Sequence, residues 1–102
     1  MDKQIFKEIQ ALKRQILPNE RVILFGSQAR GDEHKESDWD LLVLLNKKER
    51  NFSEDFDKYS SPFFEVGVKY GTCIVPVIYT VNDWEKPSML RYNVEREGIE
   101  IV

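Results

Sequence analysis

Cysteine and histidine are almost missing from this sequence, which contains one of each among 102 residues. A lone thiol, Cys73, cannot pair within the chain and cannot build a cysteine-based zinc site. This usage fits a reducing compartment, so we expect a cytoplasmic protein. Long apolar runs are missing too: none approaches the roughly 18 residues of a membrane-spanning helix, and residues 1–17 are charged throughout, so we expect neither a membrane span nor a signal peptide.

An excess of positive charge is also lacking. Lysine and arginine number 15 against 18 aspartates and glutamates, which gives a formal net charge of -3 and an isoelectric point of about 5.2. Such a field repels a polyanion, so we do not expect extended nucleic acid as a partner. The composition is that of a globular protein, without repeats, linkers or low-complexity segments. The length predicts a single domain over residues 1–102.

Helical and strand-like patterns alternate along the chain and predict an α+β protein, with helices packed on a small mixed β-sheet. Ile5, Ile9 and Ile16 recur at the spacing of an amphipathic helix, while residues 21–25 form a short apolar run typical of a buried strand. Pro76 lacks an N–H and therefore suits an edge or a bulge. The expected elements are a helix within 1–17, a strand at 21–25, a short helix capped by Ser27 and ending at Gly31, a strand at 38–45, two helical pieces within 46–70 divided near 60–62, a strand at 73–80, a helical turn at Trp84 capped by Asn82, a helix at 88–97 and an edge strand at 99–102.

Residues 26–40 carry the main indication of function. Gly26-Ser27 ends the first predicted strand, and Asp38-Trp39-Asp40 opens the second. The end of one strand meets the start of the next only if the two run antiparallel, which is why we expect a mixed sheet. The two-residue period of a strand places Asp38 and Asp40 on one face and Trp39 in the core.

The two aspartates share one small volume. At a separation of roughly 6 Å their repulsion amounts to about 1–3 kcal/mol, and a cation removes it. Oxygen ligands with open coordination positions suit Mg²⁺, which keeps water and phosphate oxygens in its shell; Mn²⁺ accepts the same ligands. We therefore predict that Asp38 and Asp40 are the metal ligands and the catalytic residues.

The Gly-Ser pair is suited to phosphate. Gly26 lets the backbone turn sharply and lets phosphate approach without a Cβ in the way, while Ser27 adds a hydroxyl and the amides of a helix N-terminus. A Gly-Lys-Ser/Thr sequence does not follow, so this is not a Walker loop. A Gly-Ser pair alone is usually a turn, and an Asp-x-Asp alone is usually a solvated strand start, but their conjunction favours a nucleotide site.

Two neighbouring residues have more than one interpretation. Arg30 can neutralise a phosphate or form a structural ion pair with Asp32. Ser37 can bond locally and orient Asp38, or it can contact phosphate. We include both Arg30 and Ser37 among the predicted phosphate-binding residues.

Residues 22–44, V-I-L-F-G-S-Q-A-R-G-D-E-H-K-E-S-D-W-D-L-L-V-L, resemble the signature of the minimal nucleotidyltransferases of the DNA polymerase beta superfamily, of the MntA-like antitoxin type. The resemblance implies a polymerase-beta-like core and transfer of a nucleoside monophosphate, AMP from ATP or its counterpart from another triphosphate, to a hydroxyl with release of pyrophosphate. It implies Gly26 and Ser27 as triphosphate ligands and Asp38 and Asp40 as ligands of Mg²⁺. It also implies a protein partner, such as a HEPN-domain protein.

The chain departs from the family at the strand predicted over residues 73–80. A third carboxylate normally lies on that strand, whereas this segment contains no acid and has Pro76 or Val77 at the corresponding place. Glu65, Asp83 and Glu85 are near in sequence, but we expect them to be solvated. The departure keeps a second hypothesis open, a catalytically weak nucleotide-binding antitoxin or regulatory subunit that acts by binding its partner.

Aromatic and charged residues elsewhere are interpreted more simply. Tyr79 and Trp84 could stack on a base, but packing is the more usual role of aromatics near a strand end. Residues 95–97 are expected to be a solvated helix end, and His34 a solvated loop residue.

Overall fold

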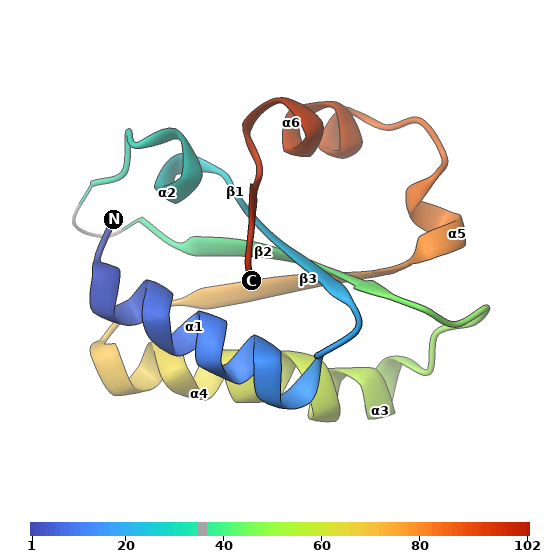
Figure 1. Cartoon of the computed structure of the whole chain (residues 1–102), viewed down its shortest axis with the longest axis horizontal. Coiled ribbons are helices and arrows are strands. Elements are labelled where there is room, and N and C mark those ends of the chain that lie inside the picture. The colour runs from blue at the N-terminus through green and yellow to red at the C-terminus, as the bar shows by residue number, and fades with distance from the viewer. Residues whose placement is uncertain (35–36) are drawn as a thin grey trace.

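The computed structural model describes residues 1–34 and 37–102, and within these the chain forms one four-stranded sheet in the order β3-β2-β1-β4 (Figure 1). Strands β1 and β2 are antiparallel, β2 and β3 are parallel, and β4 pairs antiparallel with β1. The predicted α+β class and mixed sheet are confirmed. The elements are α1 (Lys3–Ile16), β1 (Arg21–Phe25), α2 (Ser27–Arg30), β2 (Trp39–Leu45), α3 (Phe52–Asp55), the π-helical segment η1 (Phe56–Ser60), α4 (Ser61–Tyr70), β3 (Ile74–Thr80), α5 (Val81–Trp84), α6 (Met89–Glu97) and β4 (Ile99–Glu100).

Helices cover both faces of the sheet, and the side chains of β2 alternate between two apolar clusters. Trp39, Leu41 and Val43 pack with residues of α1 and α4, whereas Leu42 and Leu44 pack on the other face with residues of α5 and α6. Figure 1 shows α1 beside α4 on one side of the strands and α6 on the other. Trp39 is buried, as its place in the strand predicts. Asp40 has the parity of Leu42 and therefore belongs to the α6 side.

The segment between β2 and β3 differs from the prediction. Helix is continuous through α3, η1 and α4, and the break expected near residues 60–62 is absent. The Ser61 N–H donates to the Phe56 carbonyl, a π-helical bond. Pro62 then lies in the first turn of α4. A proline is tolerated at that position because the first N–H groups of a helix need no intrahelical partner.

Two predicted helix caps were placed one or two residues too late. Ser27 is the first residue of α2, whose N-cap is Gly26, although the helix does end at Gly31. The cap of α5 is Thr80, whose Oγ1 accepts the Asp83 N–H over 3.2 Å, rather than Asn82. Threonine is also a favourable N-cap, and the chain turns into the helix directly after β3, which makes Thr80 the capping residue.

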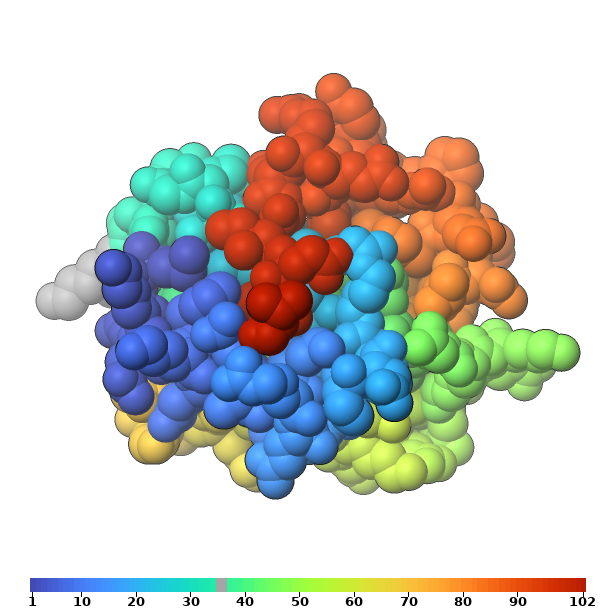
Figure 2. All heavy atoms as spheres, in the orientation of Figure 1, coloured from blue at the N-terminus to red at the C-terminus, as the bar shows by residue number. Residues whose placement is uncertain are grey.

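Both edges of the sheet are modified or short. Pro76 lies on the edge strand β3, as predicted, where its missing N–H costs no ladder bond. The Ile78 carbonyl of the same strand accepts from Arg50 Nη1 over 2.7 Å. The opposite edge is the two-residue β4. The C-terminal end of the chain then lies against the N-terminal part (Figure 2). Gln10 and Arg14 of α1 donate hydrogen bonds to the Val102 carbonyl. Among the described residues, none of the helices is both long and apolar enough to cross a membrane.

Candidate functional site

Gly26 is the turning point of the site. It follows β1 directly and has φ 78°, a conformation that favours glycine. A Cβ at this position would lie 2.4 Å from Asp40 Oδ2. The β1–β2 register pairs Phe25 with Asp40, so the antiparallel ladder brings the Asp40 carboxylate against the Gly26 backbone. Glycine is therefore required here both for its φ and for the space that the carboxylate fills.

The two predicted metal ligands lie together at the start of β2. Asp38 is exposed just before the strand, and Asp40 is half-buried within it. Burial and the negative charge of Asp38 raise the pKa of Asp40, and the positive charge of Arg30 offsets part of that rise. Asp40 is thus a carboxylate whose ionisation is opposed by its surroundings, and a bound cation would relieve this.

The predicted phosphate donors converge on one acid. The Gly26 N–H donates to Glu97 Oε1 over 3.2 Å, and Arg30 Nη1 donates to the same oxygen over 3.1 Å. Arg30 Nε also donates to Asp32 Oδ2 over 3.0 Å, so the structural ion pair considered from the sequence is present. Both acids raise the pKa of the Arg30 guanidinium, Asp32 more than Glu97. Ser27 is partly buried at the start of α2, beside Gly26.

Glu97 was expected at a solvated helix end, and this expectation was wrong. Its side chain is only 15% exposed because α6 ends against β1. The signal that could have found it is the register of β4. The ladder pairs Leu24 with Ile99, so an extension by two residues puts Glu97 opposite Gly26. That pairing was not predicted from the sequence, and Glu97 was missed for this reason.

Ser37 lies apart from these groups. Its Oγ accepts the His34 N–H over 2.8 Å, and its carbonyl accepts from Gln28 Nε2 over 3.3 Å. Ser37 lines a cavity on the side of Trp39 and α1. The contacts agree with the local role in which Ser37 orients the chain before Asp38, and they do not bring its hydroxyl to Gly26.

The acid-free character of β3 holds in three dimensions. Val75 pairs with Asp40 in the parallel ladder, and Val75 and Val77 have the parity of Tyr79, which packs on the α6 side. Val75 therefore lies beside Asp40, Val77 lies two residues further along the same face, beside Leu42, and Pro76 points to the other face. Within residues 1–34 and 37–102, no group of three or more His, Cys, Asp or Glu side chains could hold a metal ion. The remaining sequence candidates, Glu65, Asp83 and Glu85, are exposed.

Tyr79 and Trp84 pack against each other. Their ring centroids lie 5.3 Å apart at an interplanar angle of 72°, an edge-to-face contact. Both belong to the apolar cluster of the α6 side. Their packing role agrees with the simpler of the two interpretations.

Comparisons with known proteins identify a family. Residues 3–99 match the family model described as nucleotidyltransferase domain. A protein of Methanocaldococcus jannaschii named as a protein adenylyltransferase is 36% identical over 99 residues, which is 97% of this chain and 93% of that protein.

Solved structures share the fold. A toxin–antitoxin crystal structure with AMP-PNP has a TM-score of 0.66 and 21% identity over 95% of this chain and 72% of that chain. A mutant of the toxin–antitoxin MntA-HpeT has a TM-score of 0.64 and 18% identity over 95% of this chain and 71% of that chain. At these identities the likeness concerns the arrangement of helices and strands.

Proposed function

The chain belongs to the nucleotidyltransferase family and is a nucleotidyltransferase; from this premise we propose that it transfers AMP from ATP to a hydroxyl group of a partner protein. The observation that carries the proposal is the approach of the Asp40 carboxylate to the Gly26 backbone, within 2.4 Å of where a Cβ would lie. The name of the 36% identical relative, a protein adenylyltransferase, supports the choice of AMP and of a protein acceptor.

Asp38 and Asp40 would hold Mg²⁺, or Mn²⁺ in its place. The donor set fits, because both ligands offer oxygen only, and the raised pKa of Asp40 indicates a negative charge without sufficient compensation. A divalent ion in this position neutralises charge on the triphosphate and on the two carboxylates. Asp40 would contribute the more buried ligand oxygen and Asp38 the more exposed one, at the solvent-accessible start of β2.

Gly26, Ser27 and Arg30 would hold the triphosphate. The Gly26 N–H and the Arg30 guanidinium converge on a single point, at which they now bind a carboxylate oxygen. Donors arranged around one anionic oxygen suit a phosphate oxygen as well. Ser27 adds a hydroxyl, and the amides of residues 27 and 28 precede the first helical bond of α2. Ser37 would orient Asp38 by fixing the backbone just before it, through the hydrogen bond that its hydroxyl accepts from the His34 N–H.

A weaker activity is the second candidate, and the acid-free β3 favours it. Val75 and Val77 cannot accept a proton from the attacking hydroxyl, and loss of a general base typically lowers a rate about 10²–10⁴-fold. A chain of this kind would still bind nucleotide and could act as an antitoxin or regulatory subunit on a HEPN-type partner. In both cases we propose one domain over residues 1–102 and a cytoplasmic location.

Calorimetric titration with ATP and with a non-hydrolysable analogue, each with Mg²⁺ and with a chelator, tests the site without a known acceptor. We expect Mg²⁺-dependent binding that the double variant Asp38→Asn, Asp40→Asn loses while it remains folded, since the repulsion leaves with the charges. The matched control Glu65→Gln, Glu85→Gln removes the same number of exposed charges and should bind like the wild type. Unchanged affinity in the aspartate variant, or no binding by the wild type at millimolar ATP, would contradict the proposal. Labelled AMP transfer to a partner then separates the two candidate functions.

A further inference from the structure

We propose that the Glu97 carboxylate occupies the anion position of the phosphate cradle in the nucleotide-free protein, so that a triphosphate binds only by displacing it. The cradle here means the Gly26 N–H and the Arg30 guanidinium. This inference rests on the proposed function, because it concerns the regulation of that same nucleotide site. It makes α6 part of the site, although α6 lies more than 60 positions after Gly26 in the sequence.

The contacts of Glu97 are those of an anion in the cradle. One oxygen, Oε1, accepts from both donors, at 3.2 Å from Gly26 N and 3.1 Å from Arg30 Nη1. Hydrogen bonds from a charged donor to a carboxylate are among the stronger ones in proteins. A phosphate oxygen in the same position would need the same two donors, so carboxylate and phosphate exclude each other there.

The backbone fixes Glu97 in this place. The β1–β4 ladder pairs Ile23 with Glu100 and Leu24 with Ile99, and its extension sets Glu97 opposite Gly26. Gly98 lies between the helix and the ladder, where a Cβ would be 2.6 Å from Ile23 Cγ2 and 2.5 Å from the Val94 carbonyl. This close packing presses the end of α6 onto β1. A glutamate side chain has several staggered rotamers, so Glu97 can leave the cradle without movement of α6.

Glu97 does not act as the missing third carboxylate. Within the described ranges, 1–34 and 37–102, no three acidic, histidine or cysteine side chains converge as metal ligands. Glu97 contacts the two proposed phosphate donors, Gly26 and Arg30. Asp40 instead approaches the Gly26 backbone from β2.

A positioning role would have the opposite effect on affinity. If Glu97 held Gly26 and Arg30 ready for phosphate and stayed in place, its removal would weaken nucleotide binding. If it competes with phosphate, its removal strengthens binding. The sign of the change therefore decides between the two roles.

The test compares Kd values for ATP with Mg²⁺ in the wild type, Glu97→Gln, Glu97→Ala and Asp32→Asn. Glutamine keeps the size of the side chain, and alanine removes it, with urea unfolding to establish that each variant is folded. Asp32→Asn is the matched control, since Asp32 also pairs with Arg30 but does not touch Gly26. We expect both Glu97 variants to bind about tenfold more tightly, which corresponds to about 1.4 kcal/mol, and the control to change less than about threefold.

The outcomes separate this inference from the proposed function. Tighter binding by the Glu97 variants than by Asp32→Asn supports the displacement. Measurable wild-type binding with equal or weaker binding by both Glu97 variants overturns the inference and leaves the proposed function standing. An equal gain in Asp32→Asn also overturns it, because net charge alone then explains the effect. Absence of binding in the wild type and in every variant overturns the proposed function, and the inference with it.

Discussion

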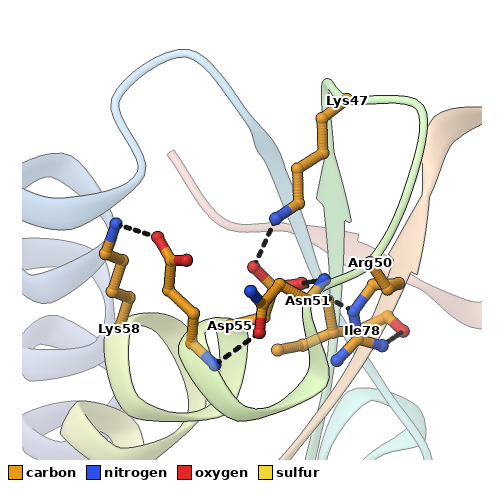
Figure 3. Close-up of polar contacts among 7 residues, drawn as sticks. Lys47, Arg50, Asn51, Asp55, Lys58 and Ile78 are labelled. Atoms are coloured by element: carbon orange, nitrogen blue, oxygen red, sulfur yellow. Dashed lines mark hydrogen bonds and ion pairs between the residues drawn. The ribbon is translucent and has the colours of Figure 1, made fainter.

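Asp55 and Asp40 are both aspartates removed from full contact with solvent, but their surroundings are opposite. The Asp55 side chain is 1% exposed and accepts from Lys47 Nζ at 2.5 Å, Arg50 Nε at 2.9 Å and Asn51 N at 3.0 Å (Figure 3). Burial alone would raise the pKa of Asp55, but these hydrogen bonds outweigh burial and lower it below its ordinary value. Every donor that a carboxylate of this kind needs is supplied by the loop beside it.

Asp40 has instead a raised pKa, because it is partly buried and has the like charge of Asp38 beside it, and the nearby charge of Arg30 offsets part of that rise. The surroundings of Asp55 and Asp40 distinguish a structural carboxylate from one suited to a ligand. A carboxylate that holds the fold together is surrounded by donors, whereas one intended for a ligand is left undercompensated, and the ligand supplies what is missing. If the proposed function is correct, stability and site chemistry belong to different aspartates of this small sheet protein.

Replacement of Asp55 by asparagine should be the most damaging single change, because it leaves two cations around a neutral, buried group. We expect a loss of about 3 kcal/mol in the free energy of unfolding, at the low end for a broken buried pair since Lys47 and Arg50 are partly exposed. Urea unfolding measures it. Glu54→Gln in the same helix, which removes the exposed partner of Lys58, is the control and should have little effect. An Asp55→Asn variant as stable as the wild type would show that the contribution of this site to stability does not depend on the negative charge. Asp55 would then no longer be an example of a carboxylate that stabilises the fold.

Much of the arrangement around Asp40 could be predicted from the sequence. The two-residue period of a strand predicted that Asp38 and Asp40 lie on one face and that Trp39 packs on the other, in the core. The order of Gly-Ser and Asp-x-Asp along the chain predicted antiparallel strands. Those inferences depend on local pattern and on one strand pairing. The comparisons confirm the family that residues 22–44 resembled. The assignment of individual site residues stays a prediction.

The remainder depended on contacts that no local pattern contains. Glu97 reaches Gly26 only because β4 pairs with β1, an association between distant segments. Pro62 predicted a break, but the π-helical turn at η1 places it in a first turn, where proline fits. Asp55 and the exposed Asp57 lie on either side of Phe56, and nothing in the local sequence distinguishes the two aspartates. Long-range strand pairing decided the position of Glu97, whereas the local backbone geometry around residues 47–62 decided the other two.

A substitution at Gly26 tests how firmly the Asp40 carboxylate is held against the backbone. Gly26→Ala adds a methyl group where Asp40 Oδ2 lies, in addition to the strain of φ 78°. Gly31→Ala is the matched control, since Gly31 has φ 80° but nothing within 4 Å of its Cβ position. We expect a loss of about 1 kcal/mol in the control and about 2–3 kcal/mol in Gly26→Ala.

Thermal or urea unfolding of both glycine variants gives the difference that belongs to Asp40. Adding Asp40→Ala to Gly26→Ala should recover most of that difference, because the clash disappears with the carboxylate. Equal losses in Gly26→Ala and Gly31→Ala would show that Asp40 moves away without cost. In that case the close approach of Asp40 to Gly26 would not constrain the site.

The smallest expected effect is the dependence of stability on pH at the two aspartates, and it has opposite signs. The folded-state pKa of Asp55 is lowered, so its contribution to stability is present above the unfolded pKa of about 3.9 and is lost as pH falls through the lower folded value. The folded-state pKa of Asp40 is raised, so protonated Asp40 stabilises the folded state relative to ionised Asp40. This contribution is present below the unfolded pKa and is lost as pH rises through the folded pKa.

Asp40→Asn should therefore stabilise the protein at pH 7, by less than about 1 kcal/mol because Asp40 is half-exposed and its repulsion is screened by solvent. The gain should shrink as pH falls below about 5 and vanish near about pH 3, where Asp40 is protonated in both states. Urea unfolding of wild type and Asp40→Asn from pH 3 to pH 7 measures it, with exposed Asp57→Asn as the control. A variant less stable than the wild type at pH 7 would mean that the Asp40 charge contributes to the fold, as that of Asp55 does. The two aspartates would then differ in degree, and the undercompensated charge could no longer mark Asp40 as a ligand for metal.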